Sequence, residues 1–226
     1  MPSQALWMLL ASLLFATMGV CVKFASAHFN SIELVAYRGV VSCIFVASLA
    51  RWQGISLATT QPAMHAWRTA VGVVSLSAWF YAIANLPLAT AMTLNYMSSV
   101  WVAAFLVGGA LLYGKGENNG ALLATVLAGF AGVVMVLRPA FDQNQLWAGL
   151  VGLISGMTAA LAYLQVTALA RAGEPEARTV FYFALGCALV GLIAMPFAGV
   201  SAWSWPAVLW IVPIGVLASL GQLCMT

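Results

Sequence analysis

Eight runs of about twenty apolar residues alternate along this chain with short polar segments. A run of about twenty apolar residues can cross the hydrocarbon core of a bilayer as an α-helix. Such a helix satisfies its own backbone hydrogen bonds, and the runs lack the two-residue alternation of barrel strands. The pattern therefore predicts an all-α, polytopic membrane helix bundle, with helices at Ala5–Ala25, Ile32–Ala50, Trp67–Leu86, Leu88–Tyr113, Gly120–Leu137, Trp147–Ala170, Arg178–Ala198 and from Pro206 to the end.

Composition and charge support this interpretation. Of the 226 residues, 64% are hydrophobic and only 6% are charged, which is too little polar surface for a water-soluble domain. The basic residues are scattered at helix ends, which argues against a nucleic-acid partner. The four cysteines lie in apolar runs without metal-ligand spacing, and no Walker A loop is present, so we expect no metal and no cofactor.

The basic residues also predict an orientation, because cytoplasmic loops carry an excess of Lys and Arg. With a cytoplasmic N-terminus, five of these residues lie on the inner side and three toward the outer side. The inner set is Arg51, Arg68, Lys115, Arg171 and Arg178, and the outer set is Lys23, Arg38 and Arg138. The sequence therefore predicts a multi-pass protein with its N-terminus in the cytoplasm.

A weak internal repeat aligns the first three helices with the last three at a shift of 143 residues. Four identical pairs share this shift: Ser12 and Ser155, Glu33 and Glu176, Trp67 and Trp210, Gly72 and Gly215. A unit of five helices is odd, so a second copy enters the membrane from the opposite face, as in many secondary transporters. We predict an inverted repeat with one unit in residues 1–140 and a truncated second unit in 141–226; an intact eight-helix protein is the alternative.

Three segments carry a family resemblance. They are Leu86–Trp101, with the sequence LPLATAMTLNYMSSVW, Gly129–Pro139, with GFAGVVMVLRP, and Glu33–Gly39, with ELVAYRG. They resemble the third-to-fourth helix region, the fifth helix and the second-helix opening of the EamA branch of the drug/metabolite transporter superfamily. The resemblance implies ten helices in two inverted five-helix units, a bacterial inner-membrane location, and export or uptake of a small metabolite.

Polar and aromatic side chains near the helix centres are the candidate substrate-binding residues. A buried amide without a partner is costly in lipid, so these amides must face other helices or a wet cavity. Helix packing is the alternative role for each amide and aromatic side chain. As a set they predict a cavity for a planar or amphipathic organic molecule: Trp79, Tyr81, Asn95, Tyr96, Ser98, Ser99, Trp101, Tyr163, Gln165 and Gln222.

The charged residues give further expectations about energy coupling and about the charge of the substrate. No Asp or Glu is expected near the midplane, so we expect facilitated diffusion or exchange, or coupling by helices beyond this chain. We expect Arg38 to pair with Glu33 or with carbonyl groups, and His28 and His65 to lie solvated in loops. Without a midplane cluster of Arg or Lys, highly anionic substrates are disfavoured.

Three classes of function remain. The first is a secondary transporter of a small organic metabolite. The second is an intramembrane enzyme, which lacks support because HExxH, GxSxG and paired membrane aspartates are absent. The third is a structural bundle without transport. The stretch Gly152–Gly156, a GxxxG pattern, predicts close helix packing within the bundle or contact between two copies in a homodimer.

Overall fold

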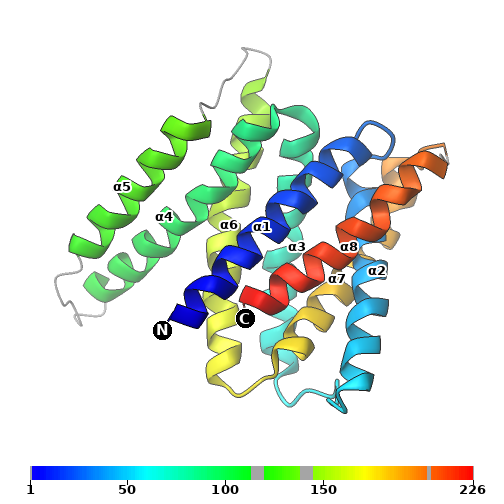
Figure 1. Ribbon diagram of the computed structural model, residues 1–226, viewed down its shortest axis with the longest axis horizontal. Coiled ribbons are helices and arrows are strands. Elements are labelled where there is room, and N and C mark those ends of the chain that lie inside the picture. Colours follow the sequence, from blue (N-terminus) through cyan, green and yellow to red (C-terminus); the bar gives the residue numbers. More distant parts are fainter. Residues whose placement is uncertain (1, 113–119, 138–144, 203–204, 226) are drawn as a thin grey trace. The chain divides into compact units, whose positions relative to one another are not determined.

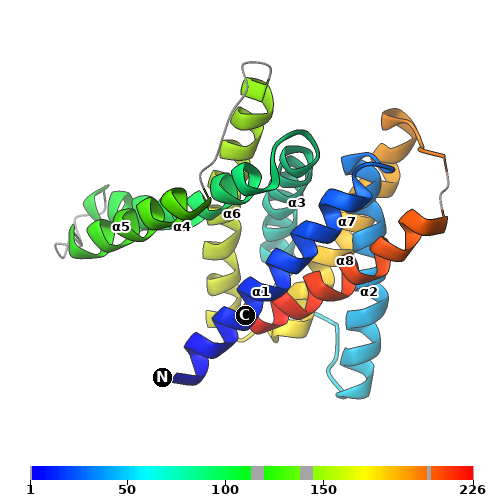
Figure 2. The same cartoon turned by 45° about the horizontal axis from the view of Figure 1, so that its top comes forward.

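The computed structural model describes residues 2–112, 120–137, 145–202 and 205–225. The described part contains helices and no strand, which confirms the all-α prediction. Over the described residues the eight predicted segments are all helical, whereas Tyr113 and Thr226, the predicted ends of the fourth and eighth segments, lie outside the described residues (Figures 1 and 2). Their bounds are α1 Pro2–Ala25, α2 Ser31–Trp52, α3 Pro62–Asn85, α4 Leu88–Leu112, α5 Gly120–Leu137, α6 Leu146–Arg171, α7 Glu176–Ala198 and α8 Trp205–Met225.

Six of these helices, α1, α2, α4, α6, α7 and α8, are long and apolar enough over their described residues to cross a membrane. The chain is therefore a multi-pass membrane protein. The residues group into two compact units, each with its own packing: unit 1 comprises residues 1–73 and 165–226, and unit 2 comprises residues 74–164. Helices from both halves of the predicted repeat share unit 1, so the repeat boundary near residue 140 stays a prediction.

In unit 1, α2 packs antiparallel against α7, and glycines set their spacing. A Cβ atom on Gly191 would lie 2.6 Å from the Cα atom of Ala36. A Cβ atom on Gly39 would meet the backbone of Ala188. The absence of these side chains lets the two backbones approach closely, as small residues do in membrane helix pairs. Arg38 lies next to this α2–α7 contact.

The helices α1 and α8 form the second antiparallel pair of unit 1, and they lie side by side in Figures 1 and 2. The rings of Phe24 and Trp210 stack with their centroids 5.2 Å apart. Near the other end of the pair, Gly221 lies against the ring of Phe15. Aromatic side chains of α1 thus pack against α8 both on a second aromatic ring and on a glycine.

In unit 2, α6 approaches α4 through the predicted GxxxG stretch. A Cβ atom on Gly156 would lie 2.5 Å from the carbonyl oxygen of Leu94, and one on Gly152 would lie 2.7 Å from the Leu94 side chain. The Ser75 hydroxyl of α3 donates a hydrogen bond to the Ser155 carbonyl oxygen at 3.0 Å. Close packing within the bundle is therefore confirmed, and this surface lends no support to a homodimer.

Candidate functional site

The ten predicted substrate-binding residues divide between the two units. Gln165 and Gln222 lie in unit 1, and the other eight lie in unit 2. A single cavity formed by all ten therefore stays a prediction. Trp79, Ser98 and Gln222 are buried, Tyr81, Asn95, Trp101, Tyr163 and Gln165 are half-buried, and Tyr96 and Ser99 are exposed.

Two of the predicted tryptophans carry buried N–H groups without a hydrogen-bond partner among the described residues. They are Trp79, whose ring packs beside Phe80, and Trp101, whose ring stacks on Phe105 at 6.1 Å. In unit 1, the amide oxygen of Gln165 is likewise buried without such a partner. Buried polar atoms of this kind are candidates for a water molecule or a polar ligand.

Several other predicted residues take part in contacts within a helix or between helices. Ser99 donates its hydroxyl hydrogen to the Tyr96 carbonyl oxygen at 2.9 Å within α4. The Tyr81 carbonyl oxygen accepts a hydrogen bond from the Asn85 side chain. Ser98 lies one turn from Leu94 at the α6 contact, since its backbone nitrogen would be 3.6 Å from a Cβ atom on Gly156. The α4 face that includes Ser98 therefore belongs to the α4–α6 contact.

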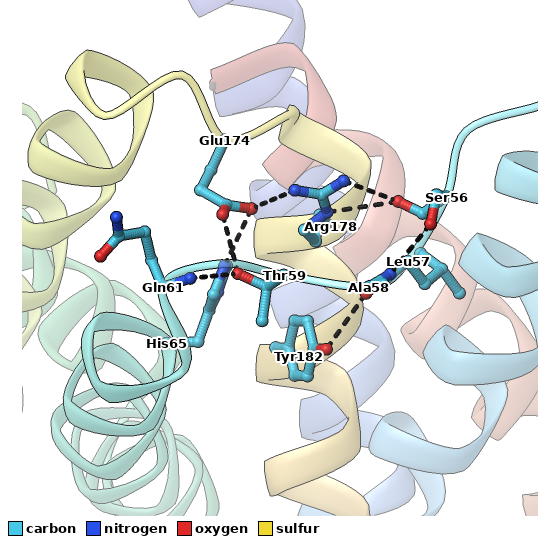
Figure 3. A network of polar contacts seen from close by, with 9 residues as sticks. All are labelled: Ser56, Leu57, Ala58, Thr59, Gln61, His65, Glu174, Arg178 and Tyr182. Carbon is cyan, nitrogen blue, oxygen red and sulfur yellow. Dashed lines mark hydrogen bonds and ion pairs between the residues drawn. The ribbon is translucent and has the colours of Figure 1, made fainter.

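A polar cluster in unit 1 joins two loops that are far apart in the sequence (Figure 3). The Glu174 carboxylate, just before α7, accepts a hydrogen bond from the Thr59 hydroxyl at 2.7 Å. It also accepts one from Arg178 Nη1 at 2.8 Å and lies 3.3 Å from His65 Nε2. Since a carboxylate only accepts, Nε2 carries the hydrogen. We call Thr59, His65, Glu174 and Arg178 the Glu174 clamp.

Further hydrogen bonds join the segment between α2 and α3 to α7 beside the Glu174 clamp. Arg178 donates from Nε and Nη2 to the Ser56 carbonyl oxygen, at 3.2 and 2.9 Å. The Tyr182 hydroxyl donates to the Leu57 carbonyl oxygen at 3.1 Å, and its ring lies 4.6 Å from the His65 ring (Figure 3). The segment between α2 and α3 is thus held against the start of α7.

The pKa of Glu174 reflects these partners. Burial of the carboxylate would raise its pKa, but hydrogen bonds from Thr59, Arg178 and His65, together with the Arg178 charge, outweigh burial. They lower the pKa from the ordinary 4.5 to about 2. Glu174 is therefore ionised at physiological pH, and the ion pair with Arg178 is intact.

A second polar cluster lies at the other end of the α2–α7 pair. The Glu33 carboxylate accepts hydrogen bonds from the backbone nitrogen and the hydroxyl of Ser201. It also accepts one from the Asn30 backbone, while the Asn30 side chain accepts from the Glu33 backbone, which forms a capping box at the start of α2. Asn30 donates to the Gly199 carbonyl oxygen as well. We call Asn30, Glu33 and Ser201 the Glu33 clamp.

The expected pairing of Arg38 with Glu33 is wrong, because the Glu33 clamp engages that carboxylate. Arg38 is 1% exposed and donates from Nη1 to Cys187 Sγ at 3.6 Å, and its Nε atom has no partner among the described residues. Its guanidinium carbon lies 5.2 Å from the centroid of the Phe183 ring. The guanidinium therefore points from α2 toward α7.

A second guanidinium lies on the same ring. The Arg68 guanidinium carbon is 4.0 Å from the Phe183 centroid, and Arg68 is 5% exposed. A side chain at Gly72 would collide with this guanidinium, so the glycine leaves room for it. The expectation that no basic cluster forms inside the bundle is therefore wrong for unit 1, where Arg38 and Arg68 meet at Phe183.

His65 is a further correction. The sequence predicts a solvated loop histidine, but His65 lies in α3, is 3% exposed and contacts Glu174. The predicted third helix begins at Trp67, whereas α3 begins at Pro62, where a proline suits the first turn. The spacing of Glu174 and Arg178, four residues apart, is the one local signal in the sequence for the Glu174 clamp.

Comparison with known proteins decides the family. The family model described as the EamA-like transporter family matches residues 2–138, which is more than half of the chain. The chain belongs to the EamA-like transporter family. The resemblance of its helix motifs to this family is thereby confirmed, although Arg138 and Pro139 of one motif lie outside the described residues.

Two relatives of this EamA-like chain are named transporters. The chain is 32% identical over 230 residues to the pseudopaline exporter of Pseudomonas aeruginosa, an alignment that covers 100% of the chain and 78% of the exporter. It is 27% identical to the riboflavin transporter of Vibrio cholerae, over 96% of the chain and 73% of the relative. These relatives agree with a membrane transporter.

A solved crystal structure of another protein has the same fold. The likeness covers 99% of this chain and 78% of the other, with a TM-score of 0.77 and 19% sequence identity. At this identity the comparison speaks for the fold alone. It agrees with the helical architecture of an EamA-like transporter.

Proposed function

We propose that this EamA-like chain is a secondary transporter that exports a small organic metabolite across the bacterial inner membrane by alternating access. The observation that carries the proposal is the family membership, together with the 32% identity to an exporter along the whole chain. A planar or amphipathic solute suits the aromatic candidates of unit 2. The riboflavin transporter is a relative named for a planar organic solute.

The contacts of unit 1 support an inverted repeat as the basis for alternating access. Gly72 of α3 lies against Phe183 of α7, and Gly215 of α8 lies against Val41 of α2. Gly72 and Gly215 are equivalent at the shift of 143 residues, as are α2 and α7. The two contacts therefore correspond to each other when the repeats are exchanged, as expected for oppositely threaded units.

The two clamps are the proposed closing contacts. Each joins a loop of the first predicted repeat to a loop of the second, and they lie at opposite ends of α2 and α7. With a cytoplasmic N-terminus, the Glu174 clamp is on the cytoplasmic side and the Glu33 clamp on the outer side. In alternating access, one clamp would open while the other holds.

Flux through proteoliposomes tests the proposal. We expect the purified full-length protein to accelerate efflux of at least one solute from a panel of amino acids, purines, riboflavin and dyes, with saturation at high solute concentration. Liposomes without protein are the control. Equal efflux from both preparations for every solute in the panel would refute the proposed transport of these solutes.

The candidate site has a separate test in α3. The substitution Trp79→Phe keeps an aromatic ring but removes the buried N–H group. If that group donates to the solute, the KM for transport should rise about 2- to 10-fold, the usual effect of one neutral hydrogen bond. Trp67→Phe is the matched control, because Trp67 lies on the same helix and is exposed. An unchanged KM in both variants would exclude a hydrogen bond from the Trp79 N–H group to the solute.

A further inference from the structure

The meeting of Arg38 and Arg68 at Phe183 is unusual for the interior of a membrane protein. Charged side chains in this environment cost several kcal/mol each and mark functional positions by default. Both guanidiniums lie on one ring, so the two charges are separated by no more than the sum of their distances to its centroid. Like charges this close repel each other, which adds to the cost of burial.

The described carboxylates do not compensate Arg38. Glu33 and Glu174 are engaged by the two clamps at opposite ends of the helix pair, and Glu176 is exposed. None of the three forms an ion pair with Arg38, whose guanidinium donates instead to the Cys187 sulfur at 3.6 Å. A cation–π contact with Phe183 recovers only about 0.5–2 kcal/mol.

We propose that Arg38 and Arg68 form a binding site for the carboxylate of a small organic acid, which is the anionic part of the transported solute. The guanidinium group offers a planar fork of N–H donors that matches a carboxylate in a bidentate geometry. Arg38 Nε, buried and without a partner among the described residues, supplies an available donor. The identification of this anion as cargo rests on the proposed transport function; the binding itself does not.

The Glu174 clamp lies next to the two arginines and holds α3 and α7 together at one end of the site. Arg68 lies three residues after His65 on α3, and Phe183 follows Tyr182 on α7. His65 and Tyr182 are both held by the Glu174 clamp and its neighbours. The clamp therefore fastens the two helices at the turn next to the arginines, and its release would open a way to them from that end.

Matched ligand pairs on the full-length protein test the proposal. Benzoate and benzamide have similar size and differ in charge, as do succinate and succinamide. We expect the two carboxylates to raise the melting temperature of the protein in a neutral detergent, and the two amides to leave it unchanged, because only a ligand of the folded state stabilises it. Equal shifts from the charged and neutral members would overturn the proposal.

Substitutions of the two arginines test whether the carboxylate binds at this site. Arg38→Gln and Arg68→Gln should each weaken benzoate binding about 10- to 100-fold, as expected for a lost charged hydrogen bond. Arg51→Gln is the control, since Arg51 lies on the same helix as Arg38 and is exposed. Undiminished benzoate affinity in both site variants would overturn the proposal. If a variant does not fold, the comparison of charged and neutral ligands on the unaltered protein decides the question.

Two further experiments distinguish a carboxylate ligand from a lipid headgroup and from a neutral solute. Stabilisation by phosphatidylglycerol in phosphatidylcholine vesicles, without any difference between benzoate and benzamide, would assign the site to a lipid headgroup and overturn the proposal. Flux of neutral solutes with no preference for carboxylates would retain transport and overturn the assignment of the bound carboxylate as part of the transported solute. Benzoate binding without flux of any solute would retain the site and remove the transport function.

Discussion

Neutralising Glu174 should destabilise the folded chain, by an amount that follows from the Glu174 clamp. The difference between a pKa of about 2 and the ordinary 4.5 corresponds to about 3 kcal/mol of native-state interaction with the ionised carboxylate. Because the cluster lies at helix ends, water screens part of this interaction, and we expect about 2 kcal/mol. For a chain of this size, Glu174→Gln should therefore lower the melting temperature by about 4–8 °C.

The assay is thermal unfolding followed by tryptophan fluorescence at a series of pH values. The folded pKa is depressed, so the stabilisation by Glu174 is fully present above the unfolded value of 4.5 and is lost as the pH falls toward about 2. The gap between the wild type and Glu174→Gln should accordingly close over that interval. Glu176→Gln is the control, because Glu176 is exposed two residues further on. Equal melting temperatures for the two variants at pH 7, or a gap that persists near pH 2, would refute the reasoning.

Three further substitutions, together with one control, probe packing and hydrogen bonds by the same measurement. Gly39→Ala places a methyl group against the α7 backbone and should cost about 1–3 kcal/mol of stability. Its control, Gly108→Ala, meets no neighbouring atom and should be neutral or stabilising. Equal effects of the two substitutions would contradict the close α2–α7 contact. Ser75→Ala removes a hydrogen bond to the α6 backbone and should cost about 1 kcal/mol. Ser201→Ala removes one of the donors to Glu33 and should cost about 1–2 kcal/mol, and no loss would show that the Glu33 clamp contributes little.

The helices could be predicted from the sequence because the bilayer imposes a length and an apolar composition on each of them. The GxxxG stretch also predicts close helix packing but not its partner, which is α4, where Gly152 and Gly156 have no side chain to hold the other helix away. Helix ends are harder to predict, and starting the third helix at Trp67 rather than Pro62 places His65 in a loop. The periodicity of apolar residues carries little information about where a helix begins.

The basic cluster could not be predicted, because its members are brought together only by tertiary packing. From the sequence, Arg38 is expected to pair with a nearby carboxylate, and Arg68 is expected to be an orienting loop charge. The carboxylate near Arg38 in the sequence, Glu33, caps its own helix instead. Phe183, the ring that both arginines share, is more than a hundred residues away in the chain. That the predicted residues of unit 2 line one cavity stays a prediction.

The location of the carboxylates also bears on energy coupling. Among the described residues, Glu33, Glu174 and Glu176 all lie at helix ends, so none of the described spans carries a carboxylate at its midplane to shuttle a proton. Glu174, with a pKa of about 2, also stays ionised on both sides of any physiological pH gradient. We therefore expect facilitated diffusion or exchange by this chain, or coupling by helices beyond it, so liposomes that contain residues 1–226 alone should equilibrate the solute under an imposed pH gradient but not accumulate it. Accumulation that follows the gradient would refute this expectation, and loss of that accumulation in His65→Gln would assign proton transfer to the buried histidine.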